Sequence, residues 1–362
     1  MSQGVVVASE TPVNPCISSP TLMTPGRVVS LSCLSLGGGD RLGVLGVVTV
    51  LLRGVEEVLC VNTPLGEGSE GRLELFLRQG WGAGQDPGLI YVAQVEEALR
   101  HEEFEKGCEA TCNGPYDGKW SKTMIGYGPE DNHFVCELTY NYGISHYEMG
   151  NDFLGMYIES SEALERAKAS GWPVKQDGEH SVLEAPGGYK FFIINKPQPG
   201  DRDPVQQVVL ASSDLEKSIK YWRDLAGLTM YKKTDKAATF GYANTQAKVI
   251  LQDIGGPVDH AKAFGRIAFA APGDELLGIE KTMKKANQTI VNPFISLETP
   301  GKAMVEVVIL ADPDDHEICF VGVEGFTELS QVDPKADDLL NEAMEKDKSD
   351  EWFAKKGGKA LA

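Results

Sequence analysis

The sequence predicts an α+β fold built from tandem βαβββ modules, and three observations support it: internal repeats, amphipathic helices between short strands, and Gly, Pro and Asp turns that separate them. TMIGYG at 123–128 recurs as ATFGYA at 238–243, and each is followed by a turn and a strand. FLGMYI at 153–158 likewise corresponds to FGRIAF at 264–269, and each leads into a helix. A two-fold duplication, with units of about fifty residues in each half, accounts for the pattern.

The predicted helices carry start and stop signals. Ser213 opens a capping box, and Gly227 follows the apolar face as a stop. A second helix begins at Ser160 or Ser161 and stops at Gly171. A third has apolar residues at helical spacing, namely Leu276, Ile279 and Met283. Each helix therefore has one face to bury against a sheet.

Composition and charge are typical of a globular protein and argue against two kinds of partner. The chain has 362 residues, enough for two compact domains, and 42% of them are hydrophobic. A net charge of -19 argues against a nucleic-acid partner, because phosphate recognition needs clustered Lys and Arg. The longest uncharged apolar run, residues 42–52, is about half as long as a membrane-spanning helix, which needs ~20 residues, so we expect no membrane partner.

The seven cysteines show no spacing typical of a disulfide framework. Cys108 and Cys112 stand close together, but no second Cys/His pair lies nearby to complete a tetrahedral zinc site. We therefore expect free thiols and a reducing compartment.

Four segments follow from composition and pattern. Residues 1–97 are rich in glycine and lack a periodic apolar pattern, which predicts a largely disordered or loosely structured segment. Residues 98–197 and residues 203–323 contain the two sets of modules. Residues 324–362 form an acidic helical tail, which can bind a partner or pack on its own barrel. We favour packing, with these docking residues: Leu339, Leu340, Met344 and Trp352.

Several longer motifs carry a family resemblance. They are the stretch 100–143, GNDFLGMYI at 150–158, EAPGGYKFF at 184–192, HAKAFGRIAF at 260–269, ILADPDDHEICFVG at 309–322 and DKSDEWFAK at 347–355. With them, the chain from about residue 99 onward resembles the vicinal oxygen chelate superfamily, to which the glyoxalases belong. The resemblance implies two glyoxalase-like domains, in which the first module pairs with the fourth and the second with the third.

The opening strand and helix of the first module differ from the family pattern. Such proteins place a strand and a helix before the segment that begins here with LRHEEF at 99–104. Two stretches can supply a surrogate strand: GVLGVVTVLLR at 43–53 and GLIYVAQV at 88–95. Without one, the first barrel would have an uncovered, aggregation-prone edge, and the domain would be destabilised.

Glyoxalase I-type members take His or Gln and Glu ligands for a divalent metal from paired modules, so the resemblance lets each position be checked. In the first module Glu137 keeps the Glu position, while its partner strand is replaced. In the fourth module Arg266 stands in place of His, and Cys319 in place of Glu. Glu317 lies two positions before the expected Glu. Because a guanidinium stays protonated, we expect Arg266 to form an ion pair with Glu137 where a cation would otherwise bind.

The other two modules keep even less of the ligand set. In the third module Gln207 holds the His/Gln position, but Ile250 holds the Glu position. In the second module Gly155 replaces His, and Phe192 replaces Glu. The remaining histidines at predicted turns are expected to be surface or capping residues, namely His133, His146 and His260.

The resemblance implies a glyoxalase-fold protein with a degenerate metal site, which binds a small molecule or a protein and lacks glyoxalase I activity. It predicts no catalytic residue and no cofactor. The alternative is a divalent-metal lyase or isomerase acting on a small carbonyl or thiol-adduct substrate, with Zn²⁺ or Ni²⁺ held at Glu137 or Gln207 and the cage completed by water. The resemblance also implies a mitochondrial or cytoplasmic setting and a Nudix-type hydrolase as partner.

Overall fold

The computed structural model describes residues 98–349, apart from 109, 145–146, 186–187, 263–264 and 298–302, together with residues 351 and 355 and three earlier strands. These strands are β1 (Val48–Arg53), β2 (Val58–Cys60) and β3 (Leu75–Leu77). All described residues belong to one compact unit, residues 41–362. The prediction of loose structure for residues 1–97 otherwise lies outside the described residues.

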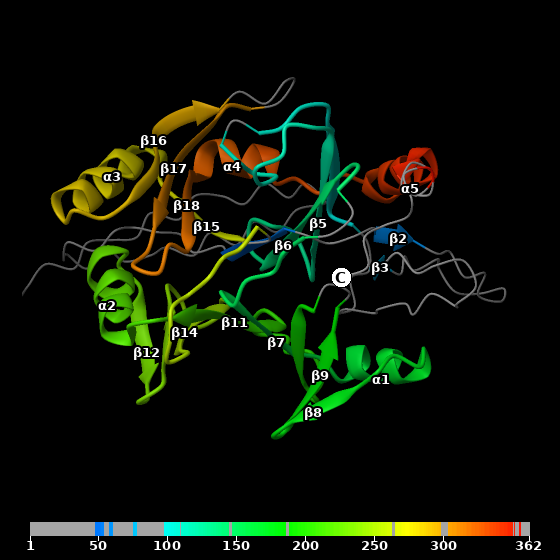
Figure 1. Cartoon of the computed structure of the whole chain (residues 1–362), viewed down its shortest axis with the longest axis horizontal. Helices are drawn as coiled ribbons and strands as arrows, with labels where there is room; N and C mark the ends of the chain where they lie inside the picture. The colour runs from blue at the N-terminus through cyan, green and yellow to red at the C-terminus, as the bar shows by residue number, and fades with distance from the viewer. Residues whose placement is uncertain are drawn as a thin grey trace, which may run out of the picture. The chain divides into compact units, whose positions relative to one another are not determined.

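Two eight-stranded sheets make up most of the fold, beside a two-stranded sheet of β2 and β3, and the first combines strands from both ends of the chain. Its order is β16-β17-β18-β15-β1-β6-β5-β4 (Figure 1). Besides β1, its strands are β4 (Arg100–Phe104), β5 (Trp120–Gly126), β6 (Val135–Asn141), β15 (Arg266–Ala271), β16 (Ile290–Leu297), β17 (Val305–Ala311) and β18 (Glu317–Gly322).

The second sheet is built from the middle of the chain, in the order β12-β13-β14-β11-β7-β10-β9-β8. Its strands are β7 (Phe153–Glu159), β8 (Lys175–Asp177), β9 (His180–Glu184), β10 (Lys190–Ile194), β11 (Val205–Ser212), β12 (Thr229–Lys233), β13 (Ala237–Gly241) and β14 (Lys248–Asp253). The first module thus shares a sheet with the fourth, and the second with the third. This is the pairing that the family resemblance implies, and it occurs within one chain.

Strand β1 takes the place of the missing first strand. It runs parallel to β6, with Leu51 opposite Glu137, and antiparallel to β15, with Leu51 opposite Arg266. Of the two candidate surrogate strands, the structure therefore uses residues within 43–53, whereas the stretch 88–95 lies outside the described residues. Because β1 fills the gap between β6 and β15, neither strand is left as an edge.

The helices follow the predicted boundaries with one correction. They are α1 (Ser161–Ala169), α2 (Leu215–Ile219), its π-helical continuation η1 (Lys220–Leu225), α3 (Leu276–Lys285) with the preceding turn η2 (Gly273–Glu275), α4 (Val323–Leu329) and α5 (Ala336–Lys346). Of the two predicted caps of α1, Ser160 is the one that the structure shows, since its hydroxyl accepts a hydrogen bond from the Ala163 amide. The cap of α2 is Asp214 and not Ser213, because the Ser213 hydroxyl donates instead to Asp314.

One apolar core joins elements of the third and fourth modules. Trp222, from η1, is fully buried and lies edge-on to Phe269 of β15, with ring centroids 6.5 Å apart. Its indole NH donates to the Asp312 carboxylate at 2.8 Å, which satisfies the one polar group of a buried tryptophan. The helix of one sheet therefore packs on a strand of the other.

The acidic tail packs on its own chain, as predicted. Helix α5 buries Leu340, and Met344 packs against the core, whereas Leu339 is exposed, so its prediction as a docking residue is wrong. Asp337 accepts a hydrogen bond from the Ala98 amide at 2.9 Å, and Asp347 accepts one from the Tyr140 hydroxyl at 2.7 Å. Trp352, the fourth predicted docking residue, lies outside the described residues.

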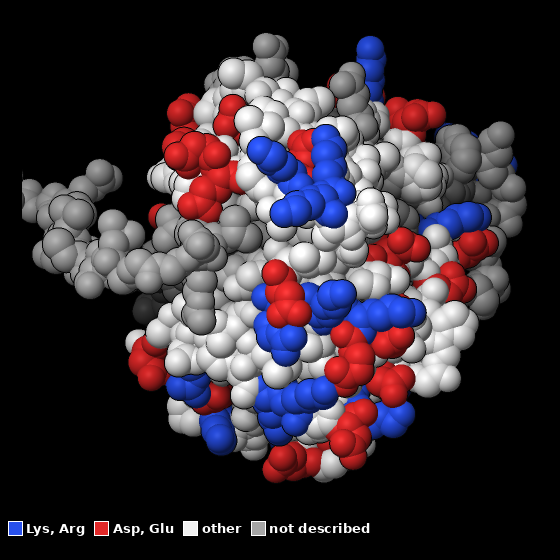
Figure 2. All heavy atoms as spheres, turned by 90° about the vertical axis from the view of Figure 1, so that its left-hand side faces the viewer, with Lys and Arg blue, Asp and Glu red and all other residues white. Residues whose placement is uncertain are grey.

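Charges of both signs are interspersed on the surface. Figure 2 shows Lys and Arg side chains among Asp and Glu on the side of the molecule that carries α2, β12 and α3. Ion pairs on these elements include Lys217 with Asp214 at 3.1 Å and Lys284 with Glu280. None of the described helices is long and apolar enough to span a membrane.

The prediction of free thiols at Cys108 and Cys112 is wrong, because the structure joins them by a disulfide. Their separation of four positions lets the chain turn back, and their Cα atoms stand 5.4 Å apart, within the usual range for a disulfide. The spacing matches neither a zinc motif nor a disulfide framework, so the sequence pattern alone does not show this local bridge.

Candidate functional site

Arg266, at the start of β15, occupies one ligand position that the family resemblance identifies. Its side chain is buried, and its Nε donates to Glu317 Oε2 at 2.7 Å. Its Nη2 donates to the same carboxylate oxygen. The two residues face each other in register on the neighbouring strands β15 and β18, which is why their side chains meet on one face of the sheet.

The loop between β4 and β5 holds the guanidinium from a second side. Arg266 Nη2 donates to the Ala110 carbonyl at 3.0 Å and to the Thr111 hydroxyl at 3.4 Å. A guanidinium has donors only and stays protonated, so it offers no lone pair to an ion. This position of the first sheet therefore carries a fixed positive charge.

The predicted ion pair between Glu137 and Arg266 is wrong, because Glu317 is the partner of Arg266. Strand β1 lies between the strands of Glu137 and Arg266, with Leu51 opposite both. The backbones of β6 and β15 are therefore two strand spacings, or about 10 Å, apart. Only extended side chains could form a hydrogen bond across that distance. Glu317 stands two positions before the expected ligand in the sequence, and the register of β15 and β18 places it beside Arg266.

Cys319 lies in the same cluster and is a free thiol. Burial raises its pKa to about 11, with Glu137 and Glu317 adding to the rise and Arg266 opposing it. The thiolate, which is the form that binds metals and attacks electrophiles, is therefore disfavoured. Cys319 is a poor substitute for the Glu ligand that the family pattern places here.

The corresponding position of the second sheet is filled by side chains. Gly155 has φ of +132°, and a Cβ placed on it would lie 2.7 Å from both the Lys190 carbonyl oxygen and the Phe192 ring. Phe192 is buried and stacks on Tyr157, with ring centroids 4.7 Å apart. A His at position 155 would have no room, since an aromatic stack occupies the space.

Gln207 is the one residue with a ligating atom among the four predicted positions of the second sheet. It is half-buried on β11, opposite Tyr157 on one side and Lys248 on the other. Ile250 lies opposite Val209 and offers no oxygen or nitrogen. A single amide does not make a metal site.

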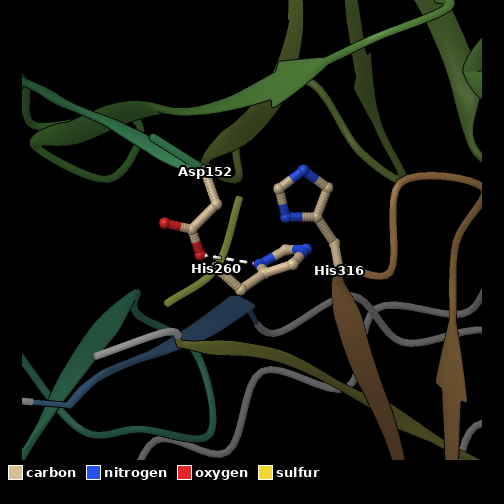
Figure 3. A group of neighbouring side chains, drawn as sticks. All are labelled: Asp152, His260 and His316. Atoms are coloured by element: carbon tan, nitrogen blue, oxygen red, sulfur yellow. Dashed lines mark hydrogen bonds and ion pairs between the residues drawn. The ribbon is translucent and has the colours of Figure 1, made fainter. Parts of the chain in front are cut away.

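A third group of polar side chains was not predicted. Asp152, His260 and His316 lie together, and each offers a potential ligand atom within 4.8 Å of those of the other two (Figure 3). His260 Nδ1 hydrogen-bonds to Asp152 Oδ2 at 2.9 Å, and its Nε2 hydrogen-bonds to the Asp314 carbonyl at 2.7 Å. Burial alone would lower the pKa of His260, but these hydrogen bonds outweigh it and raise the pKa to about 9.

The histidines expected at the surface thus have different environments. His133 contacts the Pro129 carbonyl within its own turn at 3.3 Å, as expected of a capping residue. His260 is half-buried and bound to Asp152, so the expectation of a surface residue is wrong for it. His146 lies outside the described residues.

An open cavity of about 610 Å³ lies apart from these clusters. It is bordered by the β5–β6 turn, the connection between β10 and β11, and α4. Its lining is mixed in polarity and includes Asp131, His133, Gln198, Arg202, Phe326 and Thr327. The volume falls in the range of small-molecule sites.

Known proteins with similar sequences agree with this architecture. A family model described as "Glyoxalase domain-containing protein 4-like, C-terminal domain" matches residues 214–329. Glyoxalase domain-containing protein 4 of Mus musculus is 58% identical over 261 residues, which cover 71% of this chain and 87% of that protein. A Caenorhabditis elegans protein named Glyoxalase 1 is 47% identical over 258 residues, covering 71% of this chain and 90% of that one.

A solved structure shows the same fold. Glyoxalase I from Zea mays is 22% identical, covers 64% of this chain and 85% of its own, and superposes with a TM-score of 0.53. The identity, coverage and module arrangement lead to one conclusion: the chain belongs to the glyoxalase domain-containing protein 4 family.

Proposed function

We propose that this protein binds a small molecule and does not carry out the metal-dependent lyase reaction of glyoxalase I. The observation that supports this most directly is the buried Arg266–Glu317 pair at an inherited ligand position. The guanidinium there has no lone pair for a cation, and it already binds the Glu317 carboxylate.

The residues at the inherited positions do not fit a divalent metal. In the first sheet Leu51 is opposite Glu137, and leucine has no ligating atom. Cys319 is held as a neutral thiol, and Arg266 cannot coordinate. In the second sheet the space at Gly155 is occupied by Phe192. We therefore assign no catalytic step to a metal at either inherited position.

The cavity between the β5–β6 turn and α4 is the ligand site that we favour. It offers carboxylates from Asp131 and Asp201, an amide from Gln198 and an apolar surface from Phe326. Such a mixture suits a small polar molecule that has both hydrogen-bond donors and an apolar part. We propose in addition that the protein binds a partner of the Nudix hydrolase type, and that it does so in a mitochondrial or cytoplasmic setting.

The alternative is a metal-dependent lyase or isomerase acting on a small carbonyl or thiol-adduct substrate. The retained carboxylate of Glu137 favours it, because this residue is buried on β6 at the position of a family ligand. Gln207 is the corresponding retained residue of the second sheet.

Enzyme assay and metal analysis of the same samples distinguish the two. The wild-type protein and Glu137→Ala are loaded with Zn²⁺ or Ni²⁺ and assayed for lactoylglutathione formation, with an active glyoxalase I as positive control. We expect no turnover above background and equal metal content in both proteins. Turnover that requires Glu137, or metal that is lost in Glu137→Ala, would show that the alternative is correct.

A further inference from the structure

Asp152, His260 and His316 converge from three separate segments. Asp152 directly precedes β7 of the second sheet, and His316 directly precedes β18 of the first. His260 lies in the connection between β14 and β15, which links the two sheets. Asp152 and His316 are buried, and the side chain of His260 is 18% exposed. Figure 3 shows the three side chains turned toward one another.

Backbone carbonyls orient both histidine rings. His260 Nε2 lies 2.7 Å from the Asp314 carbonyl, and His316 Nε2 lies 2.7 Å from the Ala211 carbonyl. A carbonyl only accepts hydrogen bonds, so both Nε2 atoms carry a proton. Metal-bound histidines are held in this way, with one ring nitrogen donating to a carbonyl and the other left for the ion.

The Nδ1 atom of His316 supports the same assignment. The ring is buried, and its Nε2 is engaged by the Ala211 carbonyl, so in the neutral ring the lone pair lies on Nδ1. A neutral imidazole with its proton on one nitrogen offers the other nitrogen to a metal ion. The His316 ring stands perpendicular to that of His260, with centroids 5.0 Å apart, so the two rings border one small space.

The main chain also positions the carboxylate. The Ala211 amide donates to the Asp152 carbonyl at 2.8 Å, so Ala211 of β11 fixes both Asp152 and, through its own carbonyl, His316. Asp152 Oδ2 stands 2.9 Å from His260 Nδ1. Two ligand atoms on one ion, with bonds of about 2.1 Å, lie roughly 3 to 3.4 Å apart, so this pair needs little adjustment to share a metal.

We propose that Asp152, His260 and His316 form a binding site for one divalent transition-metal ion, separate from the inherited family positions. Two imidazole nitrogens and one carboxylate oxygen suit Zn²⁺ and leave further coordination positions for water. The ion takes the lone pairs of the two Nδ1 atoms and one Asp152 oxygen. The proton between His260 and Asp152 leaves to solvent. Because its ligands come from both sheets and from their connection, the ion fastens the two sheets together.

Zinc binding to the full-length protein tests the site. The protein is stripped with a chelator and titrated with Zn²⁺ in competition with a chromophoric chelator. Co²⁺ is used in parallel because its visible absorption reports the ligand set. We expect one equivalent of tightly bound Zn²⁺. His316→Ala should weaken its binding more than about a hundredfold, since changes even outside the ligand shell cost about 10- to 100-fold.

Two control variants separate this site from other histidines and from the inherited position. His180→Ala removes a histidine of β9 whose ring packs edge-on to Tyr157 and which is not part of the cluster, and it should leave zinc affinity unchanged. Glu137→Ala should also have no effect, and zinc lost in that variant but kept in His316→Ala would overturn this proposal and the proposed function together.

Other outcomes are equally decisive. The proposal fails if the stripped wild-type protein binds no zinc, or if it binds several equivalents weakly and equally in all variants. The three side chains then form only a hydrogen-bonded cluster, and the proposed function still stands. If His316→Ala does not fold, as judged by circular dichroism, Asp152→Asn takes its place. It removes the carboxylate charge while keeping the shape of the side chain. In that variant a Co²⁺ spectrum identical to the wild type would count against the site.

Discussion

At the scale of single residues, Gly155 and Phe192 close the inherited ligand position of the second sheet. The glycine has a backbone conformation that other residues rarely adopt, and the Phe192 ring lies where its side chain would go. The position is therefore defined by a missing side chain on one strand and a large one on the next. Restoring a ligand there would require changing both.

Gly155→Ala is expected to lower the free energy of unfolding by roughly 2–4 kcal/mol, because the new methyl group meets a backbone carbonyl and φ is positive. Urea denaturation followed by circular dichroism measures this. Gly200→Ala is the matched control, since nothing lies within 4 Å of a Cβ at that position. The control should change stability by less than about 0.5 kcal/mol. Equal stability of the two variants would contradict the close packing described here.

The sequence identifies a site residue more easily when its partner lies nearby in the chain. Arg266 was identified as a residue that replaces a ligand and needs a carboxylate. The choice of Glu137 failed because the motifs do not show that β1 lies between the two strands. Asp152, His260 and His316 were missed as a group for a similar reason. Each lies in one of the motifs that carry the family resemblance, but only the pairing of the modules brings them together.

At the scale of elements, β1 fills the middle of the first sheet, and helix α5, from the opposite end of the chain, packs against the core. The sequence offered two surrogate strands and could not choose between them, because both are short apolar runs without partners specified nearby. The helices were easier to place, since their caps and apolar faces are local signals. Even so, the cap predicted for α2 is one residue off. Asp214 caps the helix, and Ser213 contacts Asp314, a residue distant in sequence.

Val50→Pro tests the position of β1. A proline removes a backbone donor from a strand that lies between β6 and β15, so we expect the free energy of unfolding to fall by about 3 kcal/mol or more. The rate of backbone amide hydrogen exchange in β6 and β15 should also rise in this variant. Val50→Thr keeps the backbone donor and the β-branched shape, and it should leave that exchange unchanged. Unaltered protection of β6 in the proline variant would show that β1 is not paired there.

Leu340→Ala tests the docking of α5. Leu340 is 3% exposed and its neighbour Leu339 is 38% exposed, so the two leucines form a matched pair on one helix. Truncating Leu340 should cost about 2–4 kcal/mol of unfolding free energy, whereas Leu339→Ala should cost less than about 1 kcal/mol. Thermal or urea unfolding measures both. A helix that bound a partner and not its own sheet would show small losses for both.

At the scale of the whole molecule, each sheet draws on both halves of the sequence. The first sheet pairs β1 and β6 with β15 and β18, and the second pairs β7 with β11. The repeat pattern predicted this arrangement through the family resemblance. Periodicity alone could not distinguish pairing within one chain from pairing between two chains, because the strands would look the same in either case.

Dividing the chain in the connection between β10 and β11 tests the arrangement. We expect residues 1–199 and 200–362 to be unfolded or aggregated when each is expressed alone, because each lacks half of both sheets. Co-expressed halves should assemble one to one. Size-exclusion chromatography and circular dichroism follow this. A half that unfolds cooperatively by itself would contradict the shared sheets.

The place of β1 also has a consequence for synthesis on the ribosome. Val48 pairs with Phe269, so the strand made first in this sheet meets its antiparallel neighbour only after most of the chain has been translated. At about 5–20 residues per second, the wait is roughly 10 to 45 s. During that time one side of β1 has no backbone partner and is open to other nascent chains. We therefore expect the yield of native protein in cells to depend on chaperones that protect emerging strands.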